Sequence, residues 1–407
     1  MPRPAHGAKL KRTLGPATLT FYGLGNILGA GIYVLIGIMA GHAGMLTPVA
    51  FIAAALIALF SVLTYAELAS RFPLSGGEAI YVQEGLRIAT LSRLVGLLVA
   101  ASGVVATATL VRGVHGYVLT FIDLPFWMVV LTVVAIIGML VLWGISQSAT
   151  IAATLTLVEI GGLLMVIWAG GDNLYLLPEH IDELTPGLET EAWAAIVPAA
   201  FLAFFAFLGF EDMVSVAEEV KHPERNLPLS IMLALSLATA LYLLVSLVAV
   251  LNIDPDRLAA SDAPLALVFK EATGFEPHVL SLIGILAVAN GALVSLIRSS
   301  RILYGMAHRG LLWRWLSEVH PLTNTPVRST LLVICATLIL AWWLPVEKLA
   351  AGTSFLILGV FALVNASLIA IKLRERSPVG TKRYPIWVPL CGLFSCLGLA
   401  ISALMLG

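Results

Sequence analysis

The sequence has little charge and little cysteine. Asp, Glu, Lys and Arg make up 12% of its 407 residues, whereas a soluble globular chain usually has roughly 25%. This is too little charge to solvate the surface of a soluble enzyme of this length. The three cysteines, Cys335, Cys391 and Cys396, lie in apolar runs, so neither a disulfide framework nor a zinc motif is present. The net charge is −1 and no Lys/Arg tract occurs, so we expect no nucleic-acid partner.

Apolar residues, in contrast, make up 59% of the chain, and the mean hydropathy is +0.98. A spanning helix needs about 20 mostly apolar residues to cross a hydrocarbon layer of roughly 30 Å. Runs of this kind occupy residues 14–41, 46–70, 94–121, 125–145, 149–169, 193–220, 228–251, 278–307, 329–344, 352–371 and 385–406. The runs are continuous rather than alternating. The sequence therefore predicts an all-α polytopic membrane protein with about 11 transmembrane helices.

Positive residues are distributed unevenly between the two sides of these spans. Cytoplasmic loops carry an excess of Lys and Arg. If the N-terminus is cytoplasmic, the outer side holds only Arg112, Arg257, Lys270 and Lys348. We therefore expect a cytoplasmic N-terminus, an outer C-terminus and a multi-pass protein of the cell (cytoplasmic) membrane.

Two spans contain residues that interrupt a helix. The span at 14–41 has four glycines within nine residues: Gly23, Gly25, Gly29 and Gly31. They either break the helix, because each costs roughly 1 kcal/mol relative to Ala, or allow close helix packing. The span at 193–220 places Gly209 beside Glu211 and Asp212. Charge at such depth normally faces the protein interior or a water-filled cavity.

These two spans are the first and the sixth, which are corresponding positions in an inverted repeat of five plus five helices. Paired Gly-interrupted helices at such positions indicate the central binding site of a transporter. Free N–H groups and half-helix N-termini suit an anion, and free carbonyls suit a cation. An amino acid carries both groups.

Several motifs add a resemblance to a known family. They are the glycine-rich string at 23–32, the stretch at 65–77, the centre and exit of the sixth span at 204–209 and 217–228, and a weaker match at 299–310. Together they resemble the amino acid–polyamine–organocation (APC) transporter superfamily. The resemblance implies a LeuT-type fold with discontinuous first and sixth spans. It also implies one transmembrane domain over 1–407, with repeats at 14–169 and 193–371 and an additional helix at 385–406.

The resemblance further implies how substrate binds. The substrate carboxylate would meet backbone N–H groups around Ile27 to Gly31, and its amine would meet carbonyls near Phe204 to Phe207. Other side chains of the third, sixth and eighth spans are candidate pocket linings. The full set of candidate substrate-binding residues is Asn26, Ile27, Leu28, Gly29, Ala30, Gly31, Gly103, Thr107, Phe204, Phe205, Ala206, Phe207, Gly209, Glu211 and Asn290.

Glu159 lies at the middle of the fifth span. Some sodium-independent relatives carry a Lys at this place. A carboxyl buried alone favours its protonated form, because desolvation penalises charge. We predict that Glu159 takes and releases a coupling proton, although a purely structural bond to a neighbouring carbonyl fits the pattern too. Ser295 and Ser299 share one face of the eighth span and are further candidates for the coupling site, or they bond their own backbone.

Glu211 has two interpretations. It selects a cationic side chain or binds a proton, or it caps the second half of the sixth span, where a negative charge is stabilising. After this span, acidic and basic residues alternate over a short stretch. They form either a cytoplasmic gate or a solvated helix end: Glu218, Glu219, Lys221 and Arg225.

No phosphate loop, nucleophile–base pair or metal-ligand spacing occurs, so we expect no enzyme activity and no cofactor. The sequence predicts a secondary active transporter that works by alternating access in a lipid bilayer, with protons as coupling ion. Its substrate would be a neutral or cationic amino acid or a related amine. An amino acid/amine exchanger of the same fold is the alternative, and a membrane receptor or enzyme a remote one. Oligomeric state is left open.

Overall fold

The computed structural model describes residues 12–29, 31–73, 77–144, 149–320, 323, 325–374 and 382–406. Within these residues the chain is helical, and its only β contact is a single parallel bridge between Leu14 and Val220. The α-helices are α1 (Pro16–Leu28), α2 (Gly31–Ala43), α3 (Thr47–Arg71), α4 (Gly77–Leu86), α5 (Ala89–Leu119), α6 (Phe126–Trp143), α7 (Ala149–Gly170), α8 (Thr190–Ala206), α9 (Pro223–Asn252), α10 (Pro255–Ala259), α11 (Pro264–Thr273), α12 (His278–His308), α13 (Val327–Trp343), α14 (Val346–Arg374) and α15 (Trp387–Leu406). Four 3-10 helices join them: η1 (Gly44–Leu46), η2 (Gly171–Leu176), η3 (Phe210–Glu219) and η4 (Arg314–Ser317).

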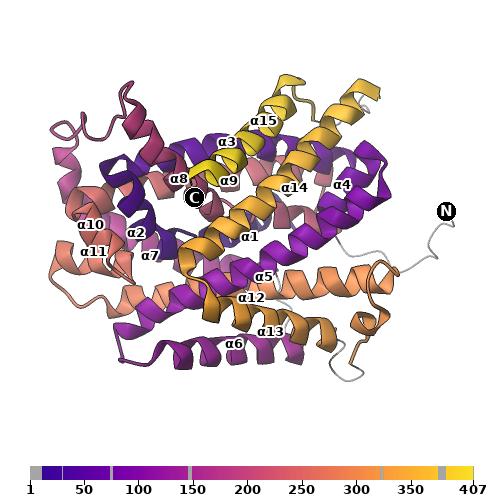
Figure 1. Cartoon of the computed structure of the whole chain (residues 1–407), viewed down its shortest axis with the longest axis horizontal. Coiled ribbons are helices and arrows are strands. Elements are labelled where there is room, and N and C mark those ends of the chain that lie inside the picture. Colours follow the sequence, from indigo (N-terminus) through magenta and orange to yellow (C-terminus); the bar gives the residue numbers. More distant parts are fainter. Residues whose placement is uncertain are drawn as a thin grey trace.

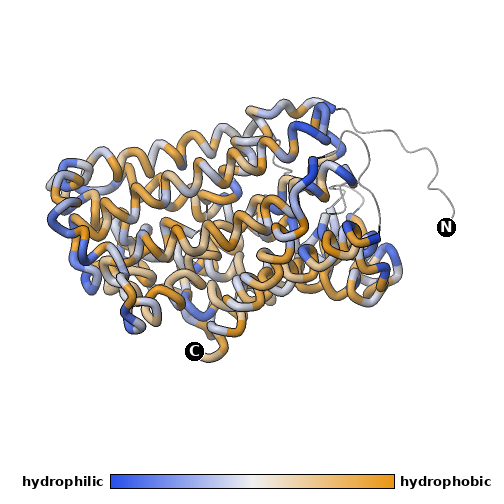
Figure 2. Tube along the Cα trace, turned by 90° about the horizontal axis from the view of Figure 1, so that it is seen from above, coloured by the Kyte–Doolittle hydropathy of each residue, from blue (hydrophilic) through white to orange (hydrophobic). Residues whose placement is uncertain are grey.

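The predicted spans coincide with these helices. In the described part of the chain, 9 helical segments are long and apolar enough to cross a membrane, and the first of them, Gly31–Arg71, joins α2, η1 and α3. Helix α13 is a shorter apolar helix. Figure 2 shows an apolar band along the helices with hydrophilic residues at both ends. The prediction of an all-α polytopic membrane protein is confirmed.

The helices lie roughly side by side, with the connecting elements at their two ends. Helix α4 lies at one end of the molecule, and α10 and α11 lie at the opposite end (Figure 1). Long helices packed against one another form the walls: α5 contacts α12 and α14, and α3 contacts α9. Helices α1 and α2 pack against α7, α8 and α9. The segment rich in glycine is therefore enclosed by other helices.

The first and sixth spans are both interrupted, as the glycines predict. Helix α1 ends at Leu28 and α2 begins at Gly31; α8 ends at Ala206 and η3 begins at Phe210. Gly209 has a φ of +123°, a conformation that L side chains rarely adopt, and its Cα faces the backbone of Asn26. The two breaks thus lie against each other.

Close packing by glycine, the alternative interpretation, also holds. A Cβ at Gly25 would collide with Thr156 of α7, and one at Gly31 would collide with Ala206 of α8. Small residues let the backbones approach at these two positions. The same glycine cluster therefore serves both the break and the packing.

The end of the molecule that holds α4 contains a buried ionic cluster around Glu67. The Glu67 side chain is 0% exposed, and both of its carboxylate oxygens accept hydrogen bonds from Lys372 Nζ at 2.7 Å. Arg71 also donates to Glu67, and the backbone N–H of Tyr384 donates to its Oε2 at 2.9 Å. This cluster joins α3, α14 and the segment before α15.

We expect the substitution Glu67→Gln to lower the free energy of unfolding by about 3–5 kcal/mol, because it leaves two cations without their buried counter-charge. Thermal unfolding of the purified protein in detergent measures the change. The control is Glu271→Gln, which breaks the half-exposed ion pair of Glu271 with Arg257 and should cost about 0–1 kcal/mol. Equal losses in the two variants would contradict the stabilising role of the cluster.

Candidate substrate and coupling site

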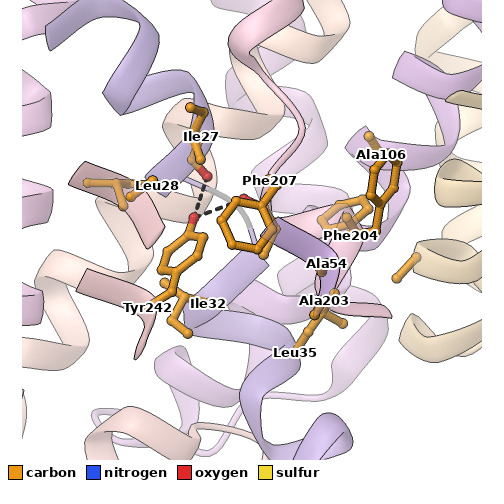
Figure 3. Packing of buried hydrophobic residues seen from close by; sticks show 14 of the residues in the cluster. Ile27, Leu28, Ile32, Leu35, Ala54, Ala106, Ala203, Phe204, Phe207 and Tyr242 are labelled. Atoms are coloured by element: carbon orange, nitrogen blue, oxygen red, sulfur yellow. Dashed lines mark hydrogen bonds between the residues drawn. The ribbon is translucent and has the colours of Figure 1, made fainter. Parts of the chain in front are cut away.

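The two helix breaks share a hydrogen-bond donor, the hydroxyl of Tyr242 on α9. It lies 2.7 Å from the carbonyl oxygen of Ile27 and 2.9 Å from that of Ala206 (Figure 3). Both carbonyls belong to helix ends, where no further turn satisfies them. One hydroxyl proton is shared between the two acceptors, so Tyr242 couples the end of α1 to the end of α8.

A small cavity adjoins the breaks. Its volume is about 30 Å³, which is room for about one or two water molecules and too little for an amino acid. The site is therefore closed in this structure. The residues that line the cavity come from α1, α5, α8, η3, α12 and α14 and the segment between α8 and η3: Gly25, Asn26, Ala106, Leu110, Phe205, Leu208, Gly209, Glu211, Asp212, Asn290, Gly291, Val294, Ser295, Arg298 and Thr353.

The cavity brings together part of the predicted site. Six candidates line it: Asn26, Phe205, Gly209, Glu211, Asn290 and Ser295. A second group is buried in the surrounding core or at the helix ends: Ile27, Leu28, Gly29, Gly31, Phe204, Ala206 and Phe207. Ala30 lies outside the described residues. The predicted backbone site at the two breaks is therefore next to a cavity.

Two candidates on α5 are placed differently. A Cβ at Gly103 would collide with Ser299, so this glycine serves the packing of α5 on α12. The Thr107 hydroxyl donates to the carbonyl of Gly103 at 2.7 Å. Neither residue lines the cavity in this closed arrangement. The Ser299 hydroxyl is buried, with no hydrogen-bond partner among the described residues.

Glu159 belongs to α7, and its side chain faces α12 and the break in the first span. Its Oε1 accepts a hydrogen bond from Asn290 Nδ2 at 3.0 Å, and its backbone carbonyl accepts one from the Tyr33 hydroxyl at 2.8 Å. The same Oε1 lies 3.6 Å from the position of a Cβ at Gly29. The other oxygen, Oε2, is buried and has no hydrogen-bond partner among the residues that the structure describes.

A second ionic cluster lines the cavity. Arg298 of α12 donates to Asp212 Oδ1 at 2.7 Å and to Glu211 Oε1 at 3.2 Å. The backbone N–H of Gly209 donates to Glu211 Oε2 at 2.8 Å. Each carboxylate oxygen of Glu211 therefore has a donor. This geometry supports the capping interpretation of Glu211, because the bond to Gly209 lies at the start of η3.

Sequence reasoning missed Arg298 and Tyr242 as parts of the site. In the structure Arg298 lies on the cavity with Ser295, which precedes it by three residues in α12. That spacing is the signal in the sequence that could have placed both on one helix face. Tyr242 gave no such signal, because one tyrosine in an apolar run is common in any buried helix.

The predicted gate residues lie where η3 ends. The backbone carbonyl of Glu219 accepts bonds from the N–H groups of Thr13 and Leu14 at 2.9 and 3.0 Å. The N–H of Lys221 donates to the carbonyl of Leu14 at 2.9 Å. These backbone contacts join the start of the first span to the end of the sixth span. A gate formed by the side chains of Glu218, Glu219, Lys221 and Arg225 stays a prediction.

Comparison with known proteins identifies the family. A family model described as amino acid permease matches residues 14–407. The chain belongs to the amino acid permease family. It is a multi-pass membrane protein of the APC superfamily, and its relatives, which include amino acid permeases, are transporters and not enzymes.

Individual relatives differ in what their names say they carry. The branched-chain amino acid permease BcaP of Bacillus subtilis is 29% identical, over 90% of this chain and 82% of its own length. The vacuolar cationic amino acid transporter 4 of Arabidopsis thaliana is 29% identical, over 89% of this chain and 64% of its own length. An uncharacterized transporter of Mycobacterium tuberculosis is 30% identical, over 97% of this chain and 87% of its own length. The family is thus established, and the substrate differs among its members.

We expect Tyr242→Phe in this permease to weaken amino acid binding by roughly 5- to 150-fold. Loss of the hydroxyl leaves two buried carbonyls unsatisfied, at a cost of about 1–3 kcal/mol, and frees the two helix ends to move apart. The shift in thermal unfolding temperature as amino acid is titrated measures the dissociation constant.

The matched control is Tyr117→Phe on α5. It also removes a buried hydroxyl, which donates to the Tyr33 carbonyl at 2.7 Å rather than to the carbonyl of Ile27 or Ala206. It should lower stability without changing the dissociation constant. A similar change in affinity in both variants would show that Tyr242 has no special role at the breaks.

Proposed function

We propose that this permease is a secondary active transporter that takes up amino acids by alternating access and is driven by protons. The observation that carries the proposal is the placement of Glu159. Its carboxyl is buried beside the break of the first span, and one of its oxygens has no partner among the described residues. A proton is the smallest cation that such an oxygen can hold.

The cost of burial supports this role. An ionised carboxylate away from water is expensive unless a cation or several donors compensate it. Among the described residues, the Glu159 side chain has one hydrogen-bond donor, the neutral amide of Asn290, and no ion pair. We infer that Glu159 carries a proton while the site is closed and loses it when opening admits water.

Contact between Glu159 and the substrate-binding segment would provide the coupling. Asn290 bonds Glu159 and also lines the cavity, and Gly29 lies next to the same carboxyl oxygen. A change of charge on Glu159 therefore acts on two elements that surround the substrate. Ser295, on the cavity, and the buried Ser299 lie farther along α12 and would support the same proton site.

We further propose that the substrate is a neutral amino acid. A carboxylate that selects a cationic side chain must be free to bind it, whereas Glu211 already binds Arg298 and the N–H of Gly209. A cationic side chain in the cavity would also meet Arg298 itself. The rest of the lining is mostly small or apolar. The name of the branched-chain relative agrees with a neutral substrate, and that of the cationic relative does not.

The remaining predictions form part of the same proposal. They are an inverted repeat of 14–169 and 193–371, a cytoplasmic N-terminus and a location in the cell membrane. An exchanger that swaps one amino acid or amine for another is the alternative function. It fits a Glu159 that stays protonated throughout the cycle.

Glu159→Gln should abolish the response of uptake to a pH gradient. The amide keeps an oxygen for the bond from Asn290 but cannot exchange a proton. In proteoliposomes loaded at higher internal pH, uptake of labelled leucine should fall to the level without a gradient, whereas exchange for internal leucine should continue. The matched control, Glu191→Gln, alters an exposed residue in the first turn of α8 and should behave as the native protein.

Two results of this experiment would oppose the proposal. Gradient-driven uptake that survives in Glu159→Gln would remove Glu159 from the coupling site. Exchange without any response to the gradient in the native protein would favour the exchanger.

Thermal stabilisation by a panel of amino acids should identify the substrate class. We expect leucine, isoleucine or valine to bind at least about tenfold more tightly than lysine or arginine, because the cationic side chains meet the positive charge of Arg298. Tighter binding of lysine or arginine would overturn the neutral assignment. Failure of every amino acid to bind would oppose the transport proposal itself.

A further inference from the structure

Glu78 belongs to α4, the helix at one end of the molecule (Figure 1). It is a partly buried residue in the first turn of α4. The hydroxyl of Tyr65 on α3 lies 3.3 Å from its Oε1. Arg298 of α12 and the two carboxyls of η3 are near enough to influence its ionisation. Helix α4 also packs on η3: the position of a Cβ at Gly77, next to Glu78, lies 3.7 Å from Val214 of η3. Glu78 therefore lies beside the cluster that Arg298 forms with Glu211 and Asp212.

The charges of this cluster do not balance. Three carboxyl groups, of Glu78, Glu211 and Asp212, are within electrostatic range of one guanidinium, that of Arg298, which binds the last two. Arg298 binds Glu211 and Asp212 directly, and Gly209 adds a backbone N–H to Glu211. Glu78, in contrast, has only the long contact with Tyr65 as a bond to a described side chain. Of the three carboxyls, Glu78 is the least compensated and the one that gains most from a proton.

The environment of Glu78 raises its pKa from its ordinary 4.5 to about 7. Burial is the largest cause, and the carboxyls of Glu211 and Asp212 add to it, whereas a backbone hydrogen bond and Arg298 act in the opposite direction. In water the pKa returns to its ordinary value. The closed arrangement is therefore most stable at low pH and loses stability as the pH rises through about 7.

The other elements packed on α4 bring no closer counter-charge. Helices α5 and α14 also contact α4. Arg93 of α5 is exposed. On α14, Arg374 donates to the carbonyls of Glu84 and Gly85 at the far end of α4, and Lys372 binds Glu67. Among the described cations, Arg298 is therefore the one that acts on the ionisation of Glu78.

We propose that Glu78 is a second proton-carrying residue of the transport cycle, placed on α4 beside a cytoplasmic gate that the bonds of Arg298 on α12 to Glu211 and Asp212 of η3 hold closed. It holds a proton while Arg298 binds Glu211 and Asp212 and the gate is closed. When η3 leaves α12 and α4, water reaches the carboxyl, its O–H bond breaks and the proton passes to cytoplasmic water. The remaining carboxylate then opposes reclosure until a proton returns. This inference rests on the proposed orientation and alternating access.

The test uses the purified full-length protein without substrate or pH gradient. Val214 of η3 is 1% exposed, and its Cγ2 lies 3.7 Å from the position of a Cβ at Gly77 of α4. In a background with the native cysteines replaced, Val214→Cys reports separation of η3 from α4 through its rate of maleimide labelling. The labelling rate is measured between about pH 5 and 8 in the protein that keeps Glu78 and in the Glu78→Gln variant. The ratio of the two rates cancels the pH dependence of the thiol itself.

The labelling rate of the protein that keeps Glu78, divided by that of the Glu78→Gln variant, should rise by roughly tenfold or more between about pH 5 and 7 and then level off. Glu84→Gln, which alters an exposed carboxyl on the same helix, should follow the native profile. Glu78→Asp should keep a pH dependence, because it keeps a carboxyl.

A ratio that does not change with pH would overturn the proposal, because the Glu78→Gln variant would then show the same rise in labelling rate as the protein that keeps Glu78. If Glu78→Gln does not fold, the native profile normalised to a small-molecule thiol gives the same decision, since a profile without a rise overturns the proposal. The assay needs no transport. Loss of the labelling response thus concerns Glu78 alone, whereas loss of gradient-driven uptake concerns Glu159.

Discussion

The hydrogen bonds of the Tyr242 hydroxyl hold together the part of the molecule on which the rest depends. In a bilayer, every backbone polar group must be satisfied within the protein, and an interrupted helix frees several of them. The carbonyls of Ile27 and Ala206 are freed at the ends of α1 and α8, and one hydroxyl from α9 satisfies both. Two broken helices can therefore exist side by side in an apolar core.

Helix α12 connects Glu159 to the ionic cluster of η3. Its Asn290 donates to Glu159 beside the first break, and its Arg298, about two turns farther on, binds Glu211 and Asp212 of η3. A single continuous helix thus contacts both Glu159 and the carboxylates of η3. A proton that binds or leaves Glu159 or Glu78 would therefore act on α12, which lines the cavity. Helix α12 thus gives the two proposed proton sites a common mechanical connection.

Much of the fold follows from rules that are local in the sequence. The apolar runs predict the spanning helices because a bilayer of fixed thickness demands them, and the glycine cluster and Gly209 predict the two breaks because glycine destabilises a helix. The choice of Glu159 and Glu211 follows from the high cost of a carboxyl at that depth. The partners of these residues, Asn290 and Arg298, could not be predicted, because helix rotation and axial position determine which side chains meet.

The sequence by itself determined an all-helical membrane protein, two interrupted spans and the few buried charges, since each reflects a cost that any fold in a bilayer must meet. Only the tertiary structure decided that Arg298 binds Glu211, that Tyr242 joins the two breaks, and that the carboxyl of Glu78 lies against Tyr65. These facts depend on contacts between residues separated by 13 to 215 positions along the chain. No local pattern records such contacts, because they arise only when helices pack.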